Sequence, residues 1–487
     1  MSRSARIARG VKATFGAELL RLAARGGITL LLTRVFLSPD EYGLVFLSIA
    51  IFSFATLFGT LGIPKSAARY VTEYRETDEG QVRNVVRSSI AINAVVLVVV
   101  AVAFVALSDT IAALYDEPRL EPLLAVGVCY IVVNVAHGYL QIAFQGFGRV
   151  PLTAATSTVS SVGQFTFIVL FLSLGFGALG ALAGYIVGYL LSAAFGAFFL
   201  YRIVSTYPGD RETEPGLRRR ILEYSIPLTA SQGGNVLYKR VDTLMVGFFM
   251  TPAAVGFYEL AKQVSTFVIA PADSLGFTVA PTFGEDKSAE RLERAARVYE
   301  RSFEYILLVY LPAVVGVLLL AEPGIRFVFG GEYAGAAPVL QAFAVYVLFQ
   351  ALDKITNDSL DYLGRATERA IGKGVTGALN VCLNLALIPA IGAAGAALST
   401  SICYGLMVTY NVYLIDREID LDYRRLVRSV AKTSAVTAVM TVAVFALQPF
   451  VSSVVSLLAV VGAGVLVWAV VSVASGLIDP NEVKAHI

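Results

Sequence analysis

Long apolar segments recur along almost the whole chain, separated by short polar connections. Each has roughly 20 or more residues, enough at a helical rise of about 1.5 Å per residue to cross a hydrocarbon core of about 30 Å. The segments lie at residues 11–36, 42–63, 85–107, 122–144, 152–174, 178–201, 222–250, 252–283, 300–321, 334–361, 366–389, 391–415, 427–447 and 451–475. The pattern predicts an all-α polytopic membrane protein with about fourteen transmembrane helices.

Basic residues lie almost entirely on one side of this predicted series of helices. With the N-terminus in the cytoplasm, 28 of the 38 Lys and Arg residues fall in cytoplasmic segments. Only Arg119 and Arg326 fall on the opposite side, and the other eight lie within apolar segments. Because cytoplasmic loops of membrane proteins are enriched in Lys and Arg, we expect a multi-pass protein of the cell membrane with both termini in the cytoplasm.

Composition supports a membrane protein and excludes several other classes. Hydrophobic residues make up 56% of the chain, charged residues 15%, and the mean hydropathy is +0.71. The net charge of +2 does not indicate a nucleic-acid partner. All three cysteines lie within apolar segments, so we expect neither a disulfide framework nor a metal site.

The short connections leave no room for a soluble catalytic domain. The chain has no Walker A sequence and no Gly-rich nucleotide fingerprint in a strand–turn–helix context. Asp420-Leu421-Asp422 is similar to the metal-binding motif of glycosyltransferases, but it stands on a short charged loop, where a solvated loop is the favoured interpretation. We therefore expect a transporter rather than an enzyme, without a cofactor.

The sequence repeats itself once. Residues 36–44 (FLSPDEYGL) and 249–257 (FMTPAAVGF) share Phe, Pro and Gly at an offset of 213, and Gly148-Arg149 recurs as Gly364-Arg365 at an offset of 216. A nearly constant offset across several segments indicates two parallel six-helix repeats, and substrate sites of such transporters form where the repeats face each other.

This repeat predicts the domain organisation. We expect an N-terminal lobe at 1–201, a flexible cytoplasmic linker at 202–221, a C-terminal lobe at 222–415, and two appended helices with a short tail at 416–487.

Two predicted helices carry stripes of polar residues at membrane depth. An ionisable side chain there costs about 2.5–3.5 kcal/mol and usually faces a cavity or a partner. At helical spacing, the first segment carries Glu18, Arg21 and Arg25, and the seventh carries Asn235, Tyr238 and Asp242, with Lys239 and Arg240 beside them. Under the offset of 213 the two stripes occupy equivalent positions, so they are predicted to line one central cavity.

The residue types in these stripes favour an anionic ligand. We expect Arg21, Arg25, Lys239 and Arg240 to bind a phosphate, whose oxygens match the guanidinium fork. Glu18, Asp242 or Asp353, the last in segment 334–361, could couple an ion gradient. The alternative is that Glu18 pairs with Arg21 and Lys239 with Asp242, as salt bridges that only orient helices.

Three stretches resemble a known family. LLLTRVFLSPDEYGLVFLSIAI (30–51), PKSAARY (64–70) and YSIPLTASQGGNVLYKRVDTLMVGFFMTPAAVGFYELAKQV (224–263) are similar to Wzx-type polysaccharide-biosynthesis flippases of the multidrug/oligosaccharidyl-lipid/polysaccharide exporter superfamily. The resemblance implies two lobes around a cationic cavity that moves isoprenoid-linked saccharides to the outer leaflet. It extends to archaeal members that serve N-glycosylation with a dolichyl phosphate carrier, possible S-layer glycan assembly included, although a bacterial source stays open.

We therefore expect a flippase for a polyprenyl- or dolichyl-(di)phosphate-linked saccharide. Its expected partners are the membrane, the lipid-linked substrate, and glycosyltransferases or an oligosaccharyltransferase of the same pathway. One alternative is a cation-coupled multidrug antiporter of the same superfamily, which predicts a cavity dominated by carboxylates. The other is a non-transporting scaffold for glycan-assembly enzymes, which predicts paired charges in the core.

Overall fold

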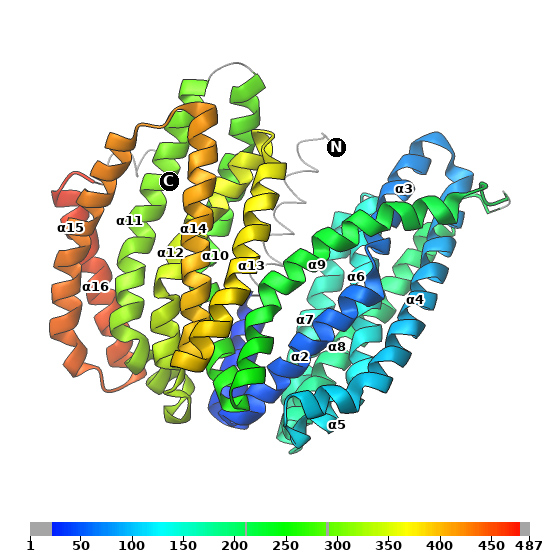
Figure 1. Cartoon of the computed structure of the whole chain (residues 1–487), viewed down its shortest axis with the longest axis horizontal. Helices are drawn as coiled ribbons and strands as arrows, with labels where there is room; N and C mark the ends of the chain where they lie inside the picture. Colours follow the sequence, from blue (N-terminus) through cyan, green and yellow to red (C-terminus); the bar gives the residue numbers. More distant parts are fainter. Residues whose placement is uncertain (1–21, 210–211, 289–291, 478–487) are drawn as a thin grey trace. The chain divides into compact units, whose positions relative to one another are not determined.

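The computed structural model describes residues 22–209, 212–288 and 292–477, and these residues form helices and turns, with no strand among them (Figure 1). Contacts group the chain into two compact units, Met1–Ala253 and Ala254–Ile487. The predicted boundaries of the two lobes, at 201 and 222, stay a prediction. In this division, the helix that follows the linker belongs to the first unit.

The first unit is built from one described half-helix and eight further helices. Residues 22–31 are helical and continue into a π-helical turn, η1 (Leu32–Phe36). The others are α2 (Pro39–Thr60), α3 (Ile63–Thr77), α4 (Glu79–Leu114), α5 (Glu121–Ala125), α6 (Gly127–Gly146), α7 (Val150–Ser173), α8 (Gly177–Val204) and α9 (Leu217–Phe249), with a short 3₁₀ turn η2 (Pro118–Leu120) before α5. Within this unit α9 runs along α2 and reaches α3 (Figure 1).

Seven long helices make up the described part of the second unit. They are α10 (Pro252–Ser288), α11 (Leu292–Gly324), α12 (Ala336–Tyr362), α13 (Ala366–Ile391), α14 (Ala393–Ile419), α15 (Tyr423–Leu447) and α16 (Val454–Ala474). Short turns η3 (Ile325–Phe329) and η4 (Gly331–Tyr333) follow α11, and η5 (Gln448–Phe450) joins the last two helices. The appended pair α15 and α16 packs on α11.

Eleven helices of the described chain are long and apolar enough to cross a membrane. This confirms a polytopic all-α protein, whereas the predicted count of fourteen and the orientation of the termini stay predictions. The three predicted spans that do not meet this test are 11–36, which lies partly outside the described residues, and α9 and α10. Both of these helices carry charged residues within their spans, for example Arg240 and Glu259, which lower their hydropathy.

One helix was not among the predicted elements. The basic segment after residue 63 forms α3, whose buried residues Ile63, Ala67, Tyr70 and Tyr74 recur at helical spacing and pack against α4 and α6. Its other face is charged, so α3 is an amphipathic helix that no search for long apolar segments detects.

The described end of the linker, residues 212–220, is tied to α3 and α4. Gln81 donates to the backbone oxygen of Glu212 at 2.9 Å and accepts from the backbone N–H of Glu214 at 3.1 Å. Arg220 pairs with Glu214 at 2.8 Å, and Tyr74 bonds both side chains. The hydrogen bond from the Tyr74 hydroxyl holds the pKa of Glu214 below its usual range. The linker, predicted to be flexible, therefore has a fixed attachment to the first unit.

The sequence repeat is visible in local geometry. Gly148 and Gly364 both end a helix in the left-handed conformation, with φ of +67° and +77°. In each case the next residue closes the turn through its backbone. The backbone N–H of Arg149 donates to the backbone oxygen of Phe144 at 2.8 Å, and that of Arg365 to the backbone oxygen of Leu360 at 2.9 Å. The offset of 216 therefore relates two helix ends with the same hydrogen-bonding pattern.

Small residues let α7 and α8 approach closely. A Cβ added at Gly184 would lie 2.5 Å from the backbone of Ile168, and one at Gly188 2.6 Å from that of Gln164. The glycine stripe on α8 is therefore a packing surface, as expected for small residues every fourth position in a membrane helix. Tyr189, next to Gly188, packs its ring against that of Tyr130 on α6.

Candidate functional site

The first helix is described from residue 22 onward, and it carries Arg25. The Arg25 side chain is exposed, whereas Thr29 and Thr33, one and two turns further on, are buried. Their hydroxyls donate to the backbone oxygens of Arg25 at 3.0 Å and of Thr29 at 2.8 Å. Glu18 and Arg21, predicted to share this face, lie outside the described residues.

The predicted stripe on α9 runs from exposed to buried positions. Asn235 and Lys239 are exposed, Tyr238 and Arg240 are half-buried, and Asp242 is buried at 3% exposure. Because α9 packs along α2 within the first unit, these residues lie in the same unit as Arg25.

Arg25 and Arg240 lie near the same tyrosine although they are far apart in the sequence. Both lie close enough to Tyr185 of α8 for their charges to act on its hydroxyl, and Arg240 also acts on Tyr130 of α6. Among the described residues neither arginine forms an ion pair with a carboxylate. The alternative pairs, Glu18 with Arg21 and Lys239 with Asp242, involve other residues and stay a prediction.

Tyr189 extends this group. Its ring lies 5.7 Å from that of Tyr130 in an edge-to-face arrangement and 5.2 Å from the imidazole of His137. We call Tyr130, Tyr185 and Tyr189 the tyrosine cluster. The first unit thus places Tyr189 between Tyr130 and His137, with Arg240 near Tyr130.

A hydrogen-bonded chain continues from His137. Its Nδ1 lies 2.8 Å from Ser192 Oγ, and its Nε2 lies 3.1 Å from Gln141 Nε2, which also donates to Ser157 Oγ at 2.7 Å. Ser192 in turn donates to the backbone oxygen of Thr156 at 2.8 Å. The chain links α6, α7 and α8 through polar atoms at membrane depth.

The second unit holds a buried carboxylate. Asp353 on α12 is 6% exposed; Asn357 donates to its Oδ2, and Asn411 of α14 lies 3.4 Å from its Oδ1. Amide donors stabilise a buried carboxylate, which is otherwise costly to keep charged. These two amides favour the ionised form of Asp353, and no described group of three or more His, Cys, Asp or Glu residues could hold a metal ion.

Several polar residues of the spans were not identified from the sequence. Glu259 of α10 is 5% exposed and pairs with Lys262 at 3.5 Å, a partner that the spacing of three residues could have indicated. Tyr185 and Tyr189 were not singled out either. Their spacing of four on a helix otherwise rich in Gly and Ala was the available signal.

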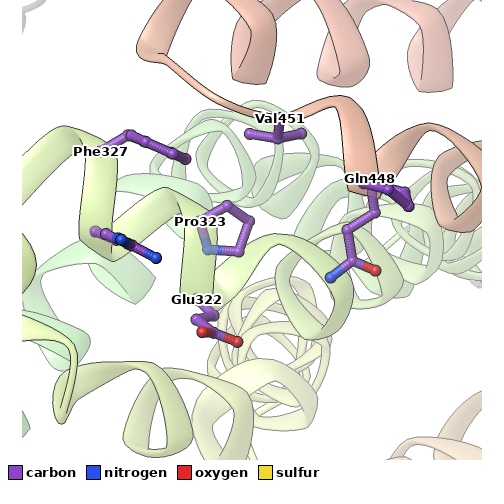
Figure 2. Close-up of a pocket in the computed structure, with 7 residues that line it drawn as sticks. Glu322, Pro323, Phe327, Gln448 and Val451 are labelled. Atoms are coloured by element: carbon purple, nitrogen blue, oxygen red, sulfur yellow. The ribbon is translucent and has the colours of Figure 1, made fainter.

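A shallow pocket lies elsewhere, at the end of α11 in the second unit (Figure 2). Glu322, Pro323 and Phe327 line one side of it, and Gln448 and Val451 line the other. Gln448 donates to the backbone oxygen of Leu319 at 3.0 Å, so its amide ties η5 to α11. None of the predicted site residues contributes to this pocket.

Comparison with known proteins identifies the family. Residues 13–285, more than half of the chain, match the model of the polysaccharide biosynthesis protein family, and residues 227–386 match the MatE model. A probable low-salt glycan biosynthesis flippase of Haloferax volcanii, Agl15, is 25% identical over 42% of this chain and 44% of its own length. The lipid II flippase MurJ of Bacillus subtilis is 24% identical over 81% of this chain and 80% of its own length.

The chain spans less than half the length of its two Haloferax volcanii relatives, Agl15 and the probable flippase AglR. Solved structures extend the likeness of the fold to nearly the whole chain. An inward closed lipid II flippase MurJ has a TM-score of 0.78 at 18% identity and covers 95% of this chain and 98% of its own. An inward-facing multidrug transporter of the MATE family has a TM-score of 0.61 at 15% identity, over 86% of this chain and 95% of its own.

Proposed function

Because the chain belongs to the polysaccharide biosynthesis protein family, we propose that it is a flippase that moves a lipid-linked saccharide across the membrane. The saccharide is carried on a polyprenyl or dolichyl phosphate or diphosphate and passes from the cytoplasmic to the outer leaflet. Its product would serve polysaccharide or glycoprotein assembly, such as an S-layer N-glycan, together with the transferases of that pathway. The names of the Haloferax volcanii relatives, and of Bacillus subtilis MurJ, support this class of substrate.

The match of residues 13–285 to the family model carries the proposal, and Arg25 and Arg240, both near Tyr185, supply its candidate site. Two guanidinium groups without a carboxylate partner among the described residues are costly at membrane depth unless an anion compensates them. A phosphate oxygen accepts two parallel hydrogen bonds from a guanidinium fork, and a phenol can donate a third. Lys239, exposed beside Arg240, and Arg21 would add positive charge, and the tail would remain in lipid.

Transport would proceed by alternating access of this cationic cavity. The charge bias of the sequence predicts that the phosphate enters from the cytoplasmic side. Neutralising the headgroup charge within the protein lowers the barrier to crossing the hydrocarbon core, since an isolated charge there is strongly disfavoured.

A cation-coupled multidrug antiporter is the second candidate, favoured by the MatE match over residues 227–386. The buried Asp353 of the second unit suits such coupling. Cationic drugs would need an acidic binding site, however, and the described charges around Tyr185 are both positive. The two functions therefore require ligands of opposite charge.

Substitution of Arg25 tests the phosphate site. In cells that lack the endogenous flippase, Arg25→Ala should abolish complementation at a normal protein level, and Arg25→Lys should restore it in part, because Lys keeps the charge but loses the fork. Arg34, an exposed arginine on the same helix, provides the matched control as Arg34→Ala. Full complementation by Arg25→Ala would contradict the phosphate site.

A further inference from the structure

The hydrogen-bonded chain from Ser192 to Ser157 fixes the orientation of one amide group. The single hydroxyl proton of Ser192 is donated to the Thr156 backbone oxygen. The Nδ1 of His137, 2.8 Å from the same hydroxyl, must therefore carry a proton and donate it. A neutral imidazole protonated on Nδ1 leaves Nε2 as an acceptor.

The acceptor on His137 then determines how Gln141 lies. Gln141 donates one N–H to His137 Nε2 and the other to Ser157 Oγ. Both amide protons are thereby used within the protein, and the side-chain oxygen Oε1 has no hydrogen-bond partner among the described residues. That oxygen is also not buried, since the buried polar atoms without partners do not include it. Gln141 thus presents a fixed, accessible hydrogen-bond acceptor.

The space around this acceptor is partly open. His137, Gln141 and Tyr189 are all half-buried, and a Cβ added at Gly138 would meet no atom within 4 Å. Tyr189 stands next to His137 with its ring 5.2 Å away. An aromatic ring beside an oriented acceptor can pack on the C–H face of a sugar ring while the acceptor binds a hydroxyl.

Tyr189 and Gln141 lie at a distance from the arginines that suits a sugar linked to a phosphate. Tyr185, on which both arginines act, is one helical turn, about 6 Å, from Tyr189 on α8. Gln141 is a further turn from His137 on α6. A saccharide whose phosphate lies at Arg25 and Arg240 would therefore extend over Tyr189 toward Gln141.

We propose that Tyr189 and Gln141 form a saccharide subsite of the first unit, in which Tyr189 packs on the sugar linked to the phosphate and Gln141 Oε1 accepts a hydrogen bond from a sugar hydroxyl. The proposal rests on the proposed function, because it uses the phosphate site to place the ligand. His137, Ser157 and Ser192 are positioning residues, which hold the amide with its oxygen outward.

Binding of two lipids to the purified full-length protein tests the subsite. The probes are a polyprenyl phosphate that carries one hexose and the same polyprenyl phosphate without sugar. The wild-type protein should bind the glycosylated lipid about tenfold more tightly, which corresponds to about 1.4 kcal/mol. Gln141→Leu and, independently, Tyr189→Leu should remove this preference and leave the affinity for the sugar-free lipid unchanged.

Gln164→Leu provides the matched control. Gln164 also donates to a serine hydroxyl one turn away, Ser160 at 2.9 Å, but within its own helix. This variant should keep the preference. An equal loss of affinity for both lipids in Gln141→Leu and Tyr189→Leu, or no loss for either lipid, would overturn the subsite. Failure of the wild-type protein to bind either lipid would instead overturn the proposed function.

Discussion

At the scale of single residues, charge and exposure distinguish two kinds of polar position. Arg25 and Arg240 have no carboxylate partner among the described residues, and both lie near Tyr185. Asp353 is buried and bonded to amides. The first kind suits an anion that arrives from outside the protein, and the second suits a proton or a small cation.

Asp353→Asn should remove the dependence of transport on an ion gradient. The amide has nearly the shape of the carboxylate and keeps one acceptor for Asn357 or Asn411, so the protein should fold, with a loss of about 1 kcal/mol of stability for the weaker hydrogen bonding. The measurement is transport into vesicles with and without an imposed gradient of protons or Na⁺.

The matched control is Asn357→Ala, which removes a hydrogen bond of Asp353 but keeps the carboxylate. If transport by the Asp353→Asn variant still depends on the proton or Na⁺ gradient, Asp353 has a structural role only.

The sequence identified part of the site, and the reason for the remainder is physical. Arg25 and Arg240 are conspicuous because a charge in an apolar segment is costly. Tyr185 is not, since tyrosine is an ordinary residue of a membrane helix. Only the packing of α6 against α8 shows that it lies near Tyr130, and helical spacing within one segment does not carry that information.

At the scale of helices, charged side chains fasten the appended pair to the second unit. Arg425, at the start of α15, bonds Glu304 at 2.8 Å and Glu300 at 3.1 Å, both on α11. Glu300 is only 4% exposed and also accepts from the backbone N–H of Asp422 at 2.9 Å. The loop that contains Asp420-Leu421-Asp422 therefore serves as a helix cap and attachment, and Leu421 within it is buried.

Arg425→Ala should destabilise the protein by about 1–3 kcal/mol. The substitution leaves the buried Glu300 without its cation, and the one-third exposure of Arg425 keeps the cost below that of a fully buried pair. Thermal unfolding of the detergent-solubilised protein measures the effect. Arg424→Ala is the control, since Arg424 is exposed and adjacent. Equal melting temperatures for the two variants would contradict this role of Arg425.

Long helices were predictable from hydropathy, and amphipathic ones were not. The spans α2, α4 and α16 follow from apolar runs long enough for the bilayer. The amphipathic α3 was missed because half of its surface is charged, and α9 does not qualify as an apolar span because of the charged and polar residues along it. Helices that carry polar or functional residues are thus the ones that hydropathy describes least well.

At the scale of the whole molecule, the distribution of basic residues predicts the direction of transport. With 28 basic residues on one side and two on the other, the linker should be cytoplasmic and Arg326 should face outside. In a background without the three native cysteines, Thr213→Cys should react with a membrane-impermeant thiol reagent only after the cells are opened, and Arg326→Cys should react in intact cells. Labelling of residue 213 from outside would show the opposite orientation in the membrane and therefore the opposite direction of transport.

The central claim is that a cationic site in the first unit carries a lipid-linked saccharide across the bilayer. Its most direct test is reconstitution of the purified protein into vesicles with a polyprenyl-phosphate-linked saccharide, with the fraction of headgroups in each leaflet followed by a membrane-impermeant enzyme. We expect that the wild-type protein moves the headgroup and that Arg25→Ala and Arg240→Ala each slow this movement at least about tenfold. Movement at the same rate in wild-type vesicles, protein-free vesicles and both variants would contradict it.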